Sequence, residues 1–96
     1  MITHVVLFKL KDKSQESVGK ARDVLLGMRG KITSLRHLEV GMDILHSERS
    51  YDIALITRFD SMENLKAYQV HPIHLEVAKY INSVKETSIA VDYESE

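Results

Sequence analysis

Cysteine is absent from this sequence of 96 residues, which excludes disulfide bonds, thiol catalysis and cysteine-ligated metals. The same absence fits a reducing compartment. No stretch approaches the roughly 18 consecutive apolar residues that a membrane span requires. The first residues also lack the basic segment and the cleavage site of a signal peptide. We therefore expect a cytoplasmic protein.

An excess of positive charge is also missing. The formal net charge is -1, so the chain lacks the basic surplus that supports binding to nucleic acid or to an anionic membrane. We find no glycine-rich phosphate loop, nucleophile elbow or paired-carboxylate motif. The sequence therefore predicts neither a nucleic-acid partner nor a membrane partner, and it lacks several familiar enzyme signatures.

What is present indicates one small globular domain that spans residues 1–96. Hydrophobic residues make up 44% of the chain and charged residues 28%, which is ordinary for a folded domain and unlike a disordered one. A chain of this length suits a single domain. Such a domain buries only a modest fraction of its surface, so association with another chain would stabilise it.

Four strands are predicted from runs of β-branched and aromatic residues between turn signals. They cover Ile2–Leu10, Leu38–Leu45, Tyr51–Phe59 and Thr87–Tyr93. Together with two predicted helices, the order is βαββαβ. This order is typical of the ferredoxin-like α+β fold, an antiparallel sheet with helices on one face.

The helices are predicted from caps and from apolar residues at helical spacing. Ser14 caps a helix that runs to about Arg29 and ends at Gly30. Asp60–Glu63 forms a capping box that opens the second helix. Proline disfavours helical geometry in the residue before it, so we expect this helix to split at His71–Pro72 and to end near residue 85.

Both faces of the central strands are apolar. In the first strand, Val5 and Leu7 share one face, and Val6, Phe8 and Leu10 share the other. An antiparallel sheet with one wet face should instead alternate apolar and polar residues. Two helices can cover only one face, so we predict a homodimer in which a second copy covers the other sheet face.

Four polar side chains are candidates for a shared site: His4, Tyr68, His71 and His74. His4 shares a strand face with Val6 and Phe8. His74 shares a helical stripe with Val77 and points inward. If the face that carries His4 is the helix-covered one, His4, Tyr68 and His74 converge on one small-molecule cavity, with His71 at its margin or mouth.

Three interpretations of the histidines stay open at this point. An inward histidine is often a core residue satisfied by backbone or water. Metal binding by His4, His71 and His74 is an alternative, although no carboxylate lies on an adjacent turn. A ligand or catalytic role has a physical basis, because burial and the helix dipole would keep His74 neutral, as a general base requires.

The chain resembles the stress-responsive A/B barrel (Dabb) family of the dimeric α/β-barrel superfamily. The resemblance rests on Phe59 and four segments: His4-Val5-Val6-Leu7-Phe8, Gly41-Met42-Asp43, Tyr51-Asp52-Ile53-Ala54-Leu55, and Tyr68-Gln69-Val70-His71-Pro72-Ile73-His74. It covers nearly the whole chain. It implies a homodimer whose two sheets face each other as a barrel.

The resemblance also implies a site. The family includes plant polyketide cyclases, in which the residues matching His4, Tyr68 and His74 line a pocket between sheet and helices, with the match to His74 as the base. It also includes stress-associated plant proteins. With only two phenylalanines and no tryptophan, this chain has a less aromatic wall, which argues against a bulky polyketide substrate.

Two functions remain in competition, with a third behind them. The first is a cofactor-free enzyme of cyclase or lyase type that acts on a small carbonyl, enol or phenolic compound, with His74 as base. The second is a non-catalytic binding or stress-associated protein in which the same histidines and tyrosine are structural. The third is haem binding or oxidation of an aromatic substrate, as in other dimeric α/β barrels.

Overall fold

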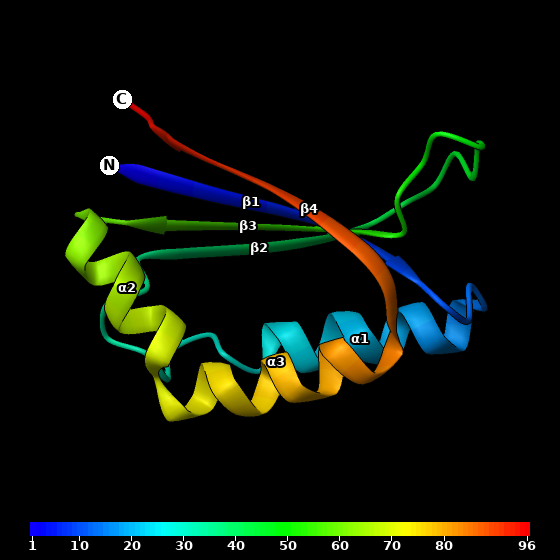
Figure 1. The fold of residues 1–96 in the computed structure, drawn as a ribbon, viewed down its shortest axis with the longest axis horizontal. Coiled ribbons are helices and arrows are strands. Elements are labelled where there is room, and N and C mark those ends of the chain that lie inside the picture. The colour runs from blue at the N-terminus through cyan, green and yellow to red at the C-terminus, as the bar shows by residue number, and fades with distance from the viewer.

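A four-stranded antiparallel sheet and three helices make up the fold of residues 1–96, described by a computed structural model (Figure 1). In chain order the elements are β1 (Ile2–Leu10), α1 (Gln15–Leu26), β2 (His37–Met42), β3 (Ile53–Phe59), α2 (Met62–Val70), α3 (Pro72–Val84) and β4 (Lys85–Glu94). The strand order is β2-β3-β1-β4. The predicted ferredoxin-like order, with a split second helix, is confirmed.

The first helix begins where predicted and ends earlier. The Ser14 hydroxyl accepts a hydrogen bond from the Ser17 backbone N–H at 3.1 Å, which satisfies one free donor of the first turn. The helix ends at Leu26 rather than near Arg29, because the chain passes through Gly27 into a run of turns. Gly30 has a φ of +77°, so its left-handed conformation belongs to those turns.

The second helix differs from the prediction by one residue at its cap. Ser61 rather than Asp60 is the N-cap, and its hydroxyl accepts from the Asn64 N–H at 3.2 Å. The Asp60 carboxylate instead pairs with Arg36. The break at His71 is as predicted, since His71 is extended (φ −65°, ψ 136°) and Pro72 opens α3.

Five strand limits also differ from the sequence-based limits. Two differ by one residue, since β2 begins at His37 and β4 ends at Glu94, and three differ by more. β2 ends at Met42, three residues before the predicted end at Leu45, and β3 begins at Ile53 rather than at Tyr51. The residues between them form a loop with hydrogen bonds of its own. β4 begins at Lys85, directly after α3, rather than at Thr87.

The helices cover one face of the sheet and create the core there. Figure 1 shows α1 and α3 along this face and α2 at one end of it. Leu10, Ala21, Met28 and Phe59 are completely buried. Burial of a leucine-sized side chain contributes roughly 1.5–3 kcal/mol, so this layer is the main source of stability. None of the three helices has the length and apolar character that a bilayer crossing demands.

The opposite face, which we call the outer face, carries no helix (Figure 1). Pairing of β1 with β3 and β4 places apolar side chains side by side on it: Val5, Leu7, Ala54, Ile56, Ile89 and Val91. Val91 is 55% exposed and Ile89 is 50% exposed. The outer face is therefore an apolar surface open to water in the isolated chain.

Candidate functional site

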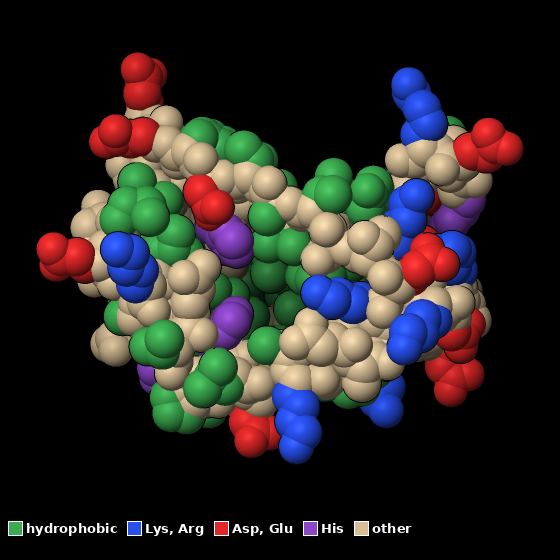
Figure 2. Space-filling view, viewed as in Figure 1, with side chains coloured by type: hydrophobic (Ala, Val, Ile, Leu, Met, Phe, Trp, Pro, Cys, Tyr) green, Lys and Arg blue, Asp and Glu red, His purple; other side chains and the backbone are tan.

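A hollow of about 210 Å³ lies between the sheet and α3. Figure 2 shows it as a recess with hydrophobic side chains at its floor and histidine side chains along one side. Its lining residues are His4, Val6, Phe8, Leu25, Met28, Leu55, Tyr68, His74, Val77, Ala78, Ile81, Asn82, Lys85 and Ser88. We call it the β4–α3 cavity. It holds a few polar groups in an apolar wall, as small-molecule sites do.

His74 stands in the first turn of α3, where the break at Pro72 turns it toward the cavity. Its Nδ1 donates a hydrogen bond to the Gln69 carbonyl oxygen at 3.1 Å. A carbonyl can only accept, so this bond places the proton on Nδ1 and leaves the lone pair on Nε2. Burial lowers the pKa of His74, and the nearby His4 and His71 lower it further against the Gln69 bond.

Tyr68 comes from the last turns of α2 and is 1% exposed. Its ring packs against Phe59, with ring centroids 4.9 Å apart, and against His74 at 4.4 Å. Burial raises the pKa of Tyr68 to about 12, and no charged or hydrogen-bonding partner contributes to that rise. The phenol therefore stays protonated at neutral pH and can donate a hydrogen bond into the cavity.

His4 lies on the helix-covered face of β1, as a shared cavity requires. Its side chain is 13% exposed, and its Nδ1 contacts the Asp92 carboxylate, which lies directly opposite on β4. A carboxylate accepts the Nδ1 proton and so leaves Nε2 free. Sequence reasoning missed Asp92, because the pairing depends on the register of β1 with β4.

The remaining predicted contacts divide into two groups. Val6, Phe8 and Val77 line the cavity. His71 is not among the lining residues, and its expected place at the margin of the cavity stays a prediction. Its Nδ1 accepts a hydrogen bond from the Ile73 N–H at 3.1 Å and so caps α3. The histidines, together with the carboxylates, form no group arranged to hold a metal ion.

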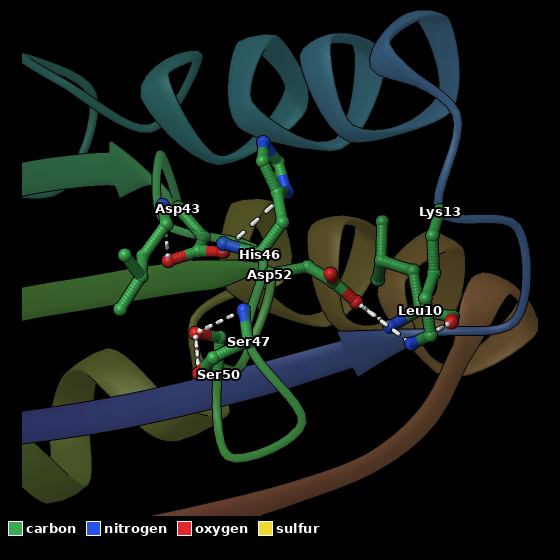
Figure 3. Close-up of polar contacts among 8 residues, drawn as sticks. Leu10, Lys13, Asp43, His46, Ser47, Ser50 and Asp52 are labelled. Carbon is green, nitrogen blue, oxygen red and sulfur yellow. Dashed lines mark hydrogen bonds and ion pairs between the residues drawn. The ribbon is translucent and has the colours of Figure 1, made fainter.

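A second polar region surrounds the loop between β2 and β3, which we call the 43–52 loop (Figure 3). The Asp52 carboxylate accepts hydrogen bonds from the Leu10 N–H at 2.8 Å and from Lys13 Nζ at 3.1 Å. The Asp43 carboxylate accepts from the N–H groups of Leu45 and His46. These bonds tie the loop to the end of β1 and to itself.

The hollow beside this loop is larger than the β4–α3 cavity, at about 500 Å³. The Lys13 ammonium that borders it is already paired with Asp52. His46 also borders it and lies 3.5 Å from Asp43. The charged groups that border this hollow are thus engaged in holding the loop in place. No sequence pattern had assigned the loop a function.

Sequence comparison identifies related proteins over the whole chain. The sequence model of the stress responsive A/B barrel domain (Dabb) matches residues 2–95. A stress-response A/B barrel domain-containing protein of Arabidopsis thaliana is 32% identical over 101 residues, which cover 100% of this chain and 48% of the relative. The chain therefore spans about half the length of that relative.

Solved structures share the fold. A dimeric protein of unknown function with a ferredoxin-like fold from Bacteroides fragilis has a TM-score of 0.85 and 31% identity, over 98% of this chain and 95% of that one. Hydroxynitrile lyase from Passiflora edulis has a TM-score of 0.84 and 17% identity, over 99% and 93% of the two chains. At that identity the lyase shows a likeness of fold alone.

Proposed function

The chain belongs to the stress-responsive A/B barrel (Dabb) family, and we propose that it binds a small carbonyl, enol or phenolic compound in the β4–α3 cavity. One observation carries this proposal. His4, Tyr68 and His74 come from three different elements and converge on one apolar hollow. Each imidazole has its Nδ1 engaged by the protein, which leaves Nε2 for a ligand.

The same groups suit cofactor-free proton abstraction, with His74 as the general base. A neutral imidazole is needed for this step, and burial favours the neutral form. Nε2 would take a proton from the carbon next to a carbonyl. The electron pair of the broken C–H bond would form a carbon–carbon double bond, and the π pair of the carbonyl would move onto its oxygen. The protonated Tyr68 would stabilise the resulting enolate by donating a hydrogen bond, and Nε2 of the Asp92-oriented His4 would accept a hydrogen bond from a hydroxyl of the ligand. A cyclase or a lyase could use this step.

Binding of p-cresol, a small neutral phenol, tests the site. We expect p-cresol to raise the melting temperature of the wild-type protein, because a ligand bound only by the folded state stabilises it. His74→Ala should lose most of that shift. His37→Ala, which removes a histidine on β2 outside the cavity, should keep it. Equal shifts in both variants would rule out the cavity as the binding site.

Exchange of hydrogen for deuterium separates catalysis from binding. In D₂O, we expect the wild-type protein to accelerate deuterium incorporation into the methyl group of acetophenone, and His74→Ala to abolish the acceleration. NMR of the methyl signal measures the rate. If p-cresol binds and no exchange is accelerated, the cavity is a binding site without the base chemistry.

We also propose that the outer faces of two copies pack against each other to form a homodimer. The support is the apolar surface around Val91 and the dimeric state given for the relative from Bacteroides fragilis. Sedimentation should show a species of twice the 11.0 kDa chain mass. Val91→Lys should yield monomers. Leu75→Lys is a matched control on α3, since both side chains are 55% exposed, and it should remain dimeric. A wild-type monomer at micromolar concentration would overturn this assembly.

A further inference from the structure

The β4–α3 cavity contains one cationic side chain and no acidic one. Lys85 is the cation, and neither aspartate nor glutamate is among the lining residues. Its Nζ donates to the Ser88 hydroxyl at 3.3 Å, and no carboxylate lies within ion-pair distance of it. The one carboxylate that contacts a lining residue is that of Asp92, which pairs with His4 and lies seven residues along β4 from Lys85. The cavity therefore has a positive charge without a partner.

A β-bulge gives Lys85 this position. β1 and β4 pair in regular register up to Lys9 and Thr87, and the register then shifts so that Leu10 pairs with Lys85. Without the extra residue, Leu10 would pair with Glu86 instead. The bulge therefore turns Lys85 toward the cavity and keeps Glu86 out of its lining. A bulge that re-aims a side chain beside a cavity favours a role for that side chain.

The polar side chains of the cavity form two sets at opposite ends. One set holds His4 and His74, and the other holds Lys85, Ser88 and Asn82. Asp92 and Ser88 are four residues apart on β4, which is about 13 Å. His74 and Asn82 are eight residues apart on α3, which is about 12 Å. Apolar side chains such as Phe8 and Val77 lie between these ends. Figure 2 agrees, with histidine on one side of the recess and a basic side chain at the opposite rim.

We propose that the ligand is an organic anion with a carboxylate held by Lys85, an apolar middle, and its enol or phenol at His74 and Tyr68. This inference rests on the proposed function of the same cavity and adds the charge and shape of the ligand. A carboxylate fits because the ammonium of Lys85 donates charge-assisted hydrogen bonds. Asn82 and Ser88 supply further polar atoms at the same end.

A pair of matched compounds tests the charge. We would measure by calorimetry the affinity for 3-(4-hydroxyphenyl)propanoate and for its neutral amide. The wild-type protein should bind the acid roughly tenfold more tightly, as a charge-assisted hydrogen bond implies. Lys85→Gln should abolish this preference, and Lys85→Arg should keep it. Lys79→Gln, which removes an exposed lysine of α3 outside the cavity, should also keep it.

Other outcomes overturn this inference in distinguishable ways. Equal binding of acid and amide by the wild-type protein would overturn the role of Lys85 while the binding of p-cresol still supports the site. An equal loss of preference in Lys79→Gln and Lys85→Gln would mean that the preference reflects overall charge. If neither acid, amide nor p-cresol binds, both the inference and the proposed function fail.

Discussion

Two regions of the molecule hold histidine, carboxylate and lysine side chains beside a hollow: the β4–α3 cavity and the 43–52 loop. In the loop, the carboxylate of Asp52 accepts bonds from Leu10 and Lys13, and that of Asp43 accepts two backbone N–H groups. In the cavity, the phenol of Tyr68 and the ammonium of Lys85 have no charged partner. The polar groups beside the loop are bonded to one another, whereas those of the cavity remain free to bind a ligand.

The difference shows that the size of a hollow is a poor guide to function. The hollow beside the loop is more than twice as large as the cavity, about 500 Å³ against about 210 Å³. Its polar groups, however, hold the loop in place. A ligand there would compete with existing hydrogen bonds, whereas a ligand in the cavity would complete unfilled ones.

The largest expected effect is a loss of stability from a substitution that disrupts the 43–52 loop and leaves the cavity intact. Asp52→Ala removes the acceptor of the Leu10 N–H, and Leu10 is completely buried. An unpaired buried N–H costs about 1–3 kcal/mol, so we expect a loss of about that size in the free energy of unfolding by urea. Asp52→Asn keeps an acceptor oxygen and should recover most of it.

Ligand binding by Asp52→Asn tests whether the loop and the cavity are independent. The shift in melting temperature that p-cresol causes should be unchanged in Asp52→Asn, because Asp52 does not line the cavity. A full loss of the shift in this folded variant would show that the two regions are not separate and would break the comparison.

A smaller effect is expected in the cavity, where His74 should make the stability of the protein depend on pH. His74 has a lowered pKa in the folded state, so the unfolded chain, with a value near 6.5, binds a proton first as pH falls. Stability should be unaffected well above pH 6.5 and should decrease as pH falls below it. The partly buried ring makes this effect smaller than that of Asp52→Ala.

The His74→Gln variant isolates this effect from that of its neighbours His4 and His71. The pH-dependent difference in urea unfolding between wild type and variant should appear only on the acid side of pH 6.5. NMR titration of the His74 ring gives the folded pKa directly, and a value above 6.5 would contradict the neutral-base proposal.

Much of the fold could be predicted because local signals fix it. The limits of β1 and the break at Pro72 follow from residue type alone, and the end of α1 was misplaced because apolar spacing continues through Met28 into the turns. At Asp60-Ser61, two adjacent residues can both cap a helix, and only the packed structure selects Ser61.

The cavity was partly predictable for the same reason. Strand alternation placed His4 and helical spacing placed His74, so their convergence followed once one sheet face was known to be helix-covered. Asp92 and Lys85 could not be found this way. Their positions depend on the β1–β4 register and on its bulge, which arise from pairing between residues far apart in the chain.

The central position of β1 has a consequence for synthesis on the ribosome. Of the four strands of this sheet, β1 is made first, and its two neighbours, β3 and β4, come from the second half of residues 1–96. Another 88 residues must be added after His4 before its partner Asp92 has been made. Chains emerge at roughly 5–20 residues per second, so for several seconds each nascent chain exposes both apolar faces of β1. Cotranslational chaperones that bind extended apolar segments therefore have their longest opportunity at residues 2–10.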